Sequence, residues 1–225
     1  MDSEFNQSLQ SDEWHMFNLY QSLSNPEGRL NRLTCGNAET LSQPGIRDSL
    51  LEFHKKWYSA NIMTLTVQGK EDLATLEKWV KESFSDIENK DVVLPNLGDP
   101  APYGDRELKK IVKFEPVQDK KKLILIWQLP YCEEDIKNQP INYFSHLFGH
   151  EGEKSLTSYL KKEGLATSLG CTPGHDLWSS SNMSVEVTLT DKGLENYKKV
   201  IELIFDFAHY IKDCGPQKYI FDEIQ

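Results

Sequence analysis

The residues of this chain best suited to metal-ion or proton-transfer chemistry are its six histidines. Two zinc-binding patterns, H-E-x-x-H and its inverse H-x-x-E-H, place two imidazoles on one helix face beside a glutamate that activates the zinc-bound water. Neither pattern occurs in the 225 residues, and G-x-S-x-G, the P-loop and G-x-G-x-x-G are absent too. The chain therefore carries none of these complete catalytic or phosphate-binding motifs.

His146 and His150 form the most suggestive local pair, because they are four residues apart and Glu151 follows them. On a helix, both imidazoles would face one metal ion. A self-contained enzyme built on this pair would hold near-stoichiometric zinc and would lose it in His150→Ala. The alternative is that Gly149 and Gly152 end the helix, which leaves the histidines as cap, packing or peptide-contacting residues.

Glu4 is a second candidate, a lone acid in the first turn of a predicted helix. Asp2 and Ser3 ahead of it are residues that cap helix starts. A carboxylate in a first turn is favoured by the helix dipole, so chemistry alone indicates an ordinary surface residue. Any further role for Glu4 depends on what the chain as a whole resembles.

The helices that would position these residues follow from hydrophobic periodicity. Apolar side chains at helical spacing predict helices within residues 2–23, 46–57, 73–84, 139–148, 154–163 and 190–208, and another begins near Pro216. The first of them is expected to bend or restart at Ser11, which is followed by two acids.

Strands follow from a different period. Alternating apolar residues predict strands at Met63–Val67 and Met183–Leu189, and Ile111–Phe114 predicts a further one. The continuous apolar run Leu123–Trp127 predicts a central strand buried on both faces. Residues 170–181 are expected to form a loop. Because strands and helices come in runs, the expected fold is α+β, with mostly antiparallel sheets and helices packed on one face.

Residues 91–106 contain three prolines and two glycines, and they are expected to link two domains, 1–90 and 107–225. The first domain shows one clear strand beside three helices, and a single strand makes no sheet. The last helix runs to Gln225 without a stop signal. Both domains are therefore expected to be partial, and both ends of the chain to be cut.

Composition narrows the class of partner. The formal net charge is −10, and no basic patch with interleaved aromatic residues occurs, which argues against nucleic acid. An acidic surface suits cationic peptides better.

The four cysteines form no C-x-x-C pair, which favours a reducing compartment. No apolar run reaches the roughly 18–20 residues of a membrane span, and no signal peptide is visible.

Several stretches, read together, resemble the insulysin/nardilysin family of inverzincin metallopeptidases, the pitrilysin type. They are Met1 to Glu4 at a helix start, Cys35 to Leu41 (family G-N-x-x-T-L), Phe53 to Met63 (F-x-x-x-Y-Y-S-S-N-x-M), His146 to Leu156 (H-L-x-G-H-E-G-x-x-S-L) and Gly215-Pro216-Gln217. The stretch from Met63 to Val80 is particularly similar to the nardilysin branch. The resemblance covers essentially the whole chain, in order.

The resemblance implies a zinc site that is only partly present. In the family, two histidines and the activating glutamate come from one helix, and a glutamate on a later helix is the third zinc ligand. Glu4 falls on that third position, and the other three residues would lie upstream of Met1. Residues 1–90 would end the zinc-binding domain, and residues 107–225 would belong to a second, non-catalytic domain. The chain alone would be inactive and would not hold Zn tightly, because zinc sites use at least three protein ligands.

The second family domain carries a peptide-anchoring exosite, which the resemblance maps to His146, His150, Gly152, Leu169 and Gly170. The alternative for the segment from His146 to Gly152 is a structural, glycine-rich helix junction. Cys171 and the turn after it depart from the glycines that are usual in the family.

The resemblance implies a zinc metalloendopeptidase that encloses peptides in a chamber and cuts at basic or dibasic sites. The expected partners are basic peptide substrates and the remaining parts of a longer parent chain. A non-catalytic peptide- or protein-binding module of the same fold is the alternative, and an H-x-x-E-H encoded upstream of Met1 would separate the two. The expected location is the cytoplasm, with the mitochondrion, the cell surface and non-classical secretion as alternatives.

Overall fold

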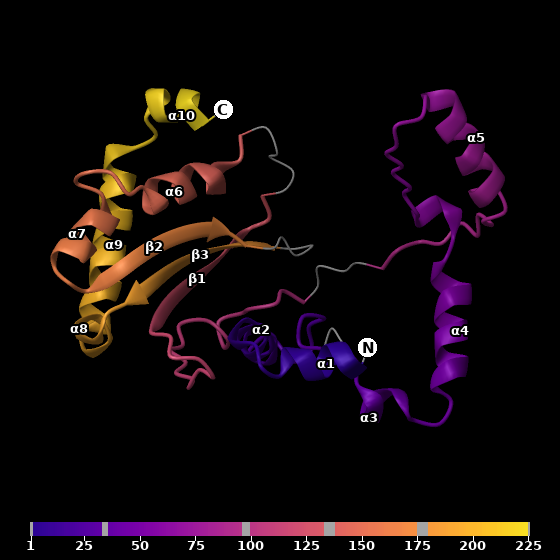
Figure 1. Ribbon diagram of the computed structural model, residues 1–225, viewed down its shortest axis with the longest axis horizontal. Coiled ribbons are helices and arrows are strands. Elements are labelled where there is room, and N and C mark those ends of the chain that lie inside the picture. Colours follow the sequence, from indigo (N-terminus) through magenta and orange to yellow (C-terminus); the bar gives the residue numbers. More distant parts are fainter. Residues whose placement is uncertain (1, 33–35, 96–99, 133–137, 175–179, 225) are drawn as a thin grey trace. The chain divides into compact units, whose positions relative to one another are not determined.

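The computed structural model describes residues 2–32, 36–95, 100–132, 138–174 and 180–224. The chain divides into two compact units (Figure 1). The first comprises residues 1–8 and 33–97, and the second comprises residues 9–32 and 98–225. The segment 9–32 thus belongs to the second unit, although it precedes most of the first in sequence. The expected peptidase-family domains at 1–90 and 107–225, joined by 91–106, stay a prediction.

The first unit is helical. It contains α1 (Asp2–Ser8), α3 (Ala38–Leu41), α4 (Ile46–Trp57), the short 3-10 helix η1 (Ala60–Ile62) and α5 (Leu73–Phe84). Side chains fix the helix starts: Asp72 Oδ1 accepts the Thr75 N–H at 2.8 Å, and Asp2 Oδ1 accepts the Ala38 N–H at 2.8 Å. The predicted helices 46–57 and 73–84 are confirmed.

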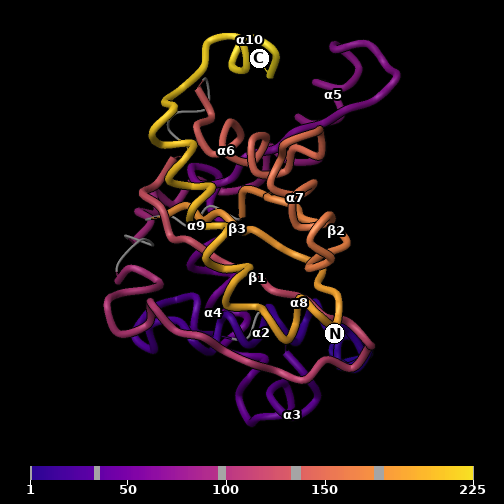
Figure 2. Tube along the Cα trace, turned by 90° about the vertical axis from the view of Figure 1, so that its left-hand side faces the viewer, coloured from indigo at the N-terminus to yellow at the C-terminus, as the bar shows by residue number. Residues whose placement is uncertain are grey.

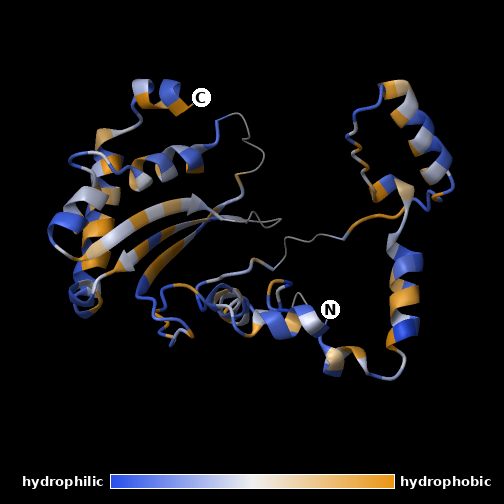
Figure 3. Ribbon diagram, in the orientation of Figure 1, coloured by the Kyte–Doolittle hydropathy of each residue, from blue (hydrophilic) through white to orange (hydrophobic). Residues whose placement is uncertain are grey.

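The apolar side of these helices is uncovered. Hydrophobic residues recur along α4 and α5 (Figure 3), yet no apolar side chain of this unit is buried among the described residues. Leu50 and Phe53, from the predicted stripe of α4, are both 58% exposed. The periodicity therefore predicted the helices correctly without predicting what covers them.

The strand predicted at Met63–Val67 is wrong. These residues form no ladder in the described part of the unit, and their side chains are exposed. A strand is stabilised by cross-strand hydrogen bonds and side-chain pairs, and no described segment of this unit supplies a partner. The alternation of apolar and polar residues is thus present, but no described strand pairs with this segment to form a sheet.

The second unit contains an antiparallel sheet of three strands, β1 (Lys122–Pro130), β2 (Ala166–Pro173) and β3 (Ser180–Leu189), in the order β1-β3-β2. Val185 of β3 is paired with Leu125 of β1 and with Cys171 of β2. The helices of the unit are α2 (Asp12–Ser22), α6 (Pro140–Gly149), α7 (Leu156–Lys162), α8 (Asp191–Glu195), α9 (Tyr197–Cys214) and α10 (Lys218–Ile224). The predicted α+β fold is confirmed.

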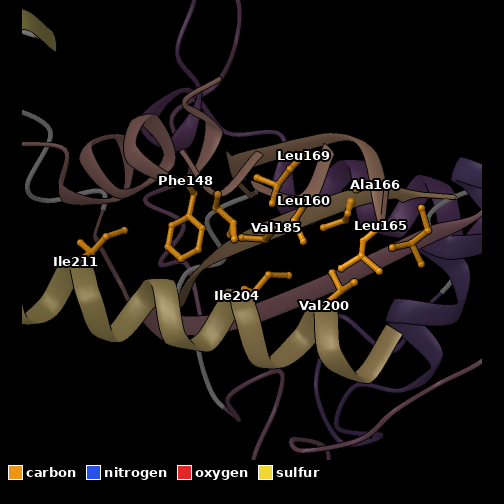
Figure 4. Close-up of a cluster of buried hydrophobic side chains, with 12 residues drawn as sticks. Phe148, Leu160, Leu165, Ala166, Leu169, Val185, Val200, Ile204 and Ile211 are labelled. Atoms are coloured by element: carbon orange, nitrogen blue, oxygen red, sulfur yellow. The ribbon is translucent and has the colours of Figure 1, made fainter. Parts of the chain in front are cut away.

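Helices α6, α7 and α9 pack on one face of this sheet (Figures 1 and 2). The side chains between them form the core (Figure 4). The buried members are Phe148, Leu156, Leu160, Leu165, Ala166, Leu169, Val185, Val187, Leu189, Val200, Ile204 and Ile211. Buried residues alternate along β3, as the period of two predicted.

Three predictions for this unit need correction. Among the described strands, Leu123–Trp127 lies in an edge strand rather than a central one, because β3 separates β1 from β2. Ile111–Phe114 forms no ladder among the described residues. The expected loop 170–181 is partly sheet, since β2 continues to Pro173 and β3 begins at Ser180, and their cross-strand pairing overrides the local turn residues.

The helix predicted from Thr190 to residue 208 is split in two at Asn196. The Thr190 hydroxyl caps α8 by accepting the Gly193 N–H at 3.0 Å, as expected. Gly215, with φ of 65°, follows the last residue of α9, where a left-handed conformation suits glycine.

Helix α2 is anchored through its first turn. Ser11 is its N-cap, so the predicted restart is confirmed. The buried Asp12 carboxylate accepts the backbone N–H groups of Val117 and Gln118 at 2.7 and 3.1 Å. The exposed Glu13 carboxylate lies 3.0 Å from Lys120 Nζ. Carboxylates thus join this helix to the turn that precedes β1.

Glu13 should make stability depend on acid pH. A hydrogen bond from its own backbone N–H, then Lys120 and Ser11, lower the pKa of its carboxyl from 4.5 to about 2. A lowered folded-state pKa stabilises the fold above pH 4.5, and that contribution is lost as pH falls from about 4.5 to about 2. Denaturation of Glu13→Gln and the unchanged chain should therefore differ at pH 6 and converge toward pH 2. A Glu13 carboxyl that titrates near 4.5 by NMR would contradict this.

Candidate functional site

The end of α6 places the two histidines on the surface of the second unit. Phe148 is buried in the core and fixes the helix against the sheet. The helix ends at Gly149, and His150 is its C-cap in an extended conformation. His146 and His150 are both exposed, and their ring centroids lie 6.2 Å apart. The glycine-ended helix is thus the arrangement observed, and it presents both imidazoles to solvent.

Gly152 allows this arrangement because it has no side chain. A Cβ atom there would lie 2.5 Å from Nε2 of His150, so the imidazole occupies the space that any other residue would fill. Glu151, between them, lies 3.5 Å from Lys161 Nζ of α7. The conformation of His150 therefore depends on Gly152, because the glycine lets the imidazole ring fold back over the chain.

The strand half of the predicted exosite is β2, against which α6 packs. Leu169 is buried in the core, so its side chain is not available to a ligand, whereas Gly170 is exposed. The Cys171 thiol lies 3.7 Å from Ser145 Oγ of α6, and burial raises its pKa. The end of α6 and the strand β2, here called the α6–β2 face, thus contain both halves of the predicted exosite, with Leu169 contributing backbone only. Gly170 is paired with Glu186, as is Ile124 of β1, which faces away from the core, so position 170 points to the side of the sheet opposite α6.

The edge of β2 that faces away from β3 is available for pairing. Within the described residues, β2 pairs with β3 alone. An exposed strand edge offers unpaired N–H and C=O groups, and extended peptides bind proteins by adding a strand to such an edge. A Cβ on Gly170 would meet nothing within 4 Å, so the space around it is open.

Glu4 lies in the first turn of α1 and is exposed. Across the described ranges, no group of three or more His, Cys, Asp or Glu residues is arranged to hold a metal ion. Structural and catalytic zinc sites take at least three protein ligands. The described residues therefore do not form a zinc site by themselves, and Glu4 would serve as a ligand only beside other residues.

A groove of about 660 Å³ in the second unit was missed by sequence reasoning. Its walls come from α2, from the segment 107–116 and from the face of β1 opposite the core. Ile124 and Ile126 line it, while Leu123, Leu125 and Trp127 pack on the core. This explains the continuous apolar run of β1: one face meets the core and the other meets the groove.

Comparison with known proteins gives the family. Residues 45–225 match the family model described as the Peptidase M16 inactive domain. The chain belongs to the M16 peptidase family. It is 38% identical over 229 residues to the putative zinc protease mug138 of Schizosaccharomyces pombe and 40% identical over 233 residues to the A-factor-processing enzyme of Saccharomyces cerevisiae. It is also 35% identical over 236 residues to nardilysin of Homo sapiens. These alignments cover 99%, 100% and 100% of the chain.

A solved M16 structure confirms the fold. The chain superposes on pitrilysin with a TM-score of 0.89 at 25% identity, covering 99% of this chain and 24% of pitrilysin. The chain spans 24%, 22% and 20% of the three relatives named above, so it corresponds to about a quarter of an M16 protein or less. The predicted family is thus confirmed. In the described residues, no helix is long and apolar enough to cross a membrane.

Proposed function

We propose that this chain is part of an M16 zinc metalloendopeptidase. The observation that carries the proposal is its match, over 99% or more of its length, to relatives named as a putative zinc protease and an A-factor-processing enzyme. In this proposal Glu4 is the third zinc ligand, beside two histidines and a water-activating glutamate from an upstream H-x-x-E-H. Bound zinc would supply Lewis-acid polarisation of the scissile carbonyl, and Glu4 would be the negatively charged ligand that this chain contributes.

The second unit anchors the substrate. His146, His150 and Gly152 at the end of α6, with the backbone of Leu169 and Gly170 on β2, form a face that takes an extended peptide. The net charge of −10 favours cationic substrates, which supports cleavage at basic or dibasic sites. The remaining parts of the parent chain are the other partners. The free thiols of Cys132, Cys171 and Cys214 suit a reducing compartment such as the cytoplasm.

Replacing Glu4 with Gln in the whole parent protein tests the zinc role. Loss of partners that merely orient metal ligands already costs about 10–100-fold in metal affinity, so loss of a ligand should cost at least about tenfold. Zinc affinity is measured by competition with a chelator. Glu39→Gln changes another exposed glutamate in the first turn of a helix and should leave zinc affinity unchanged. Equal zinc affinities in Glu4→Gln and the unchanged protein would assign Glu4 an ordinary surface role.

Peptide binding to the 225-residue chain tests the anchoring face. A fluorescent basic peptide, titrated in the presence of EDTA, should bind at least about tenfold more weakly to His146→Ala and to Gly170→Leu. The leucine side chain enters open space on the side of β2 opposite α6, so it hinders a strand added at the edge of β2 without disturbing the core. His209→Ala removes an exposed histidine of α9 and is the control. Peptide binding that is the same in all four proteins would place the anchor elsewhere.

A non-catalytic binding module is the second candidate, because residues 45–225 match the domain described as inactive. Its anchoring face would be the same. The coding sequence upstream of Met1 separates the two: an in-frame H-x-x-E-H several dozen codons before Glu4 supports the peptidase. A degraded motif, or a true start at Met1, supports the binding module and returns Glu4 to the role of a helix-start acid.

A further inference from the structure

The imidazoles of His146 and His150 have an arrangement that peptide anchoring does not require. Their ring centroids lie 6.2 Å apart, with 38° between the ring planes. Both rings are exposed, and within the described residues neither forms a hydrogen bond or an ion pair. No described residue therefore holds any of the four ring nitrogens by a hydrogen bond or an ion pair, and rotation of either side chain breaks no such contact with the described residues.

We propose that His146 and His150 form a labile two-imidazole site for a divalent transition-metal ion. Imidazole nitrogen suits Cu²⁺, Ni²⁺ and Zn²⁺, with metal–nitrogen distances of about 2.0–2.1 Å for zinc. The backbone brings both rings to one end of α6, and a small rotation of two exposed side chains lets one nitrogen of each reach a shared ion. Because Gly152 has no side chain, the His150 ring can lie against the chain at this point.

The site is expected to bind metal weakly, because the neighbouring Glu151 carboxylate is directed away from it and only the two imidazoles serve as protein ligands. Glu151 lies 3.5 Å from Lys161 Nζ, which holds it toward α7. With two protein ligands, the ion keeps open positions filled by water, unlike a structural or catalytic zinc. Such a site binds reversibly, with Cu²⁺ tightest according to the general order of metal affinities, and it discriminates against Mg²⁺, which prefers oxygen ligands.

Occupancy would regulate the anchoring face. This step rests on the proposed function, whereas metal binding itself does not. An ion shared by the two imidazoles holds both rings in one geometry and adds positive charge, and both effects disfavour a cationic peptide on the same surface. Peptide anchoring should therefore weaken as the metal site fills.

Calorimetric titration of the untagged 225-residue chain with Cu²⁺, Zn²⁺ and Mg²⁺, after chelator treatment, tests the site. Saturable binding of one Cu²⁺ ion is expected, with Zn²⁺ weaker and Mg²⁺ absent. His146→Ala and His150→Ala should each weaken Cu²⁺ binding at least tenfold, and His209→Ala should leave it unchanged. Circular dichroism checks that each exposed-site variant is folded. Cu²⁺ binding that is equal in all four proteins, or that cannot be saturated, overturns the proposal.

The peptide titration then separates the two claims. Binding of the basic peptide in EDTA tests the anchoring face without metal, and the same titration with saturating Cu²⁺ tests regulation. Regulation is supported if Cu²⁺ lowers the peptide affinity of the unchanged chain at least about tenfold. In His150→Ala, adding Cu²⁺ should leave the peptide affinity unchanged. Equal peptide affinities with and without Cu²⁺ in a chain that binds Cu²⁺ overturn the regulatory step while the metal site stands.

Discussion

Gly193→Ala is expected to lower the free energy of unfolding of the second unit by about 3 kcal/mol or more. A Cβ on Gly193 would lie 1.8 Å from the carbonyl oxygen of Leu165, and a backbone atom cannot rotate away as a side chain can. The same region is fixed by two hydrogen bonds of Thr190: its N–H donates to the Leu165 carbonyl and its hydroxyl donates to the Gly164 carbonyl. The methyl group must therefore displace the α8 cap or the start of β2.

Urea denaturation followed by circular dichroism measures this loss. Gly149→Ala is the matched control, because its added Cβ would come no closer than 3.9 Å to another atom, the Cys171 nitrogen. Alanine is the better helix former, so that change at the last residue of α6 should be neutral or stabilising. Similar denaturation midpoints for the two alanine variants would show that α8 and Leu165 do not approach each other in this way.

Elements whose sequence signal is local were predictable. Met183–Leu189 alternates because one side of β3 faces a core, and the alternation is visible in sequence whatever the partner. The Thr190 hydroxyl caps a helix by accepting the N–H of Gly193, three residues further along, which is a purely local interaction. Helices α4 and α5 were predicted on the same basis, although the structure shows their apolar faces exposed.

Elements that depend on distant partners were not predictable. The apolar run Leu123–Trp127 is equally consistent with a strand between two neighbours and with an edge strand that has both faces covered. Only the order β1-β3-β2 decides, and strand order is not encoded in one strand's composition. Met63–Val67 shows the reverse case, in which a strand pattern is present but no described segment pairs with it.

The candidate sites divide in the same way. The spacing of His146 and His150 suggested chemistry directly, but their exposure and lack of partners depend on how α6 ends and packs. Glu4 gives no chemical signal of its own, and only the family resemblance assigns it a role. The groove was invisible in sequence because its walls come from segments around residues 12–23, 107–116 and 122–128, which converge only in the fold.

Leu160→Ala should destabilise the second unit by about 2–5 kcal/mol. Leu160 is 0% exposed and belongs to the core cluster between α7, α9 and the sheet. Removing its side chain loses the transfer free energy of the buried carbons and leaves a cavity that neighbouring residues fill only in part. Because whole-domain stabilities are about 5–15 kcal/mol, this single change would remove a large share.

Leu194→Ala provides the control for Leu160→Ala, since Leu194 is 47% exposed and lies in the same unit. Its loss should cost well under half as much in urea denaturation. Leu160 and Leu169 share one core cluster, so amide hydrogen exchange of β2 should also be faster in Leu160→Ala than in Leu194→Ala. If the two alanine variants had equal stabilities, the cluster would not be the core of this unit. The α6–β2 face would then lack the rigid support that a preorganised peptide-binding surface needs.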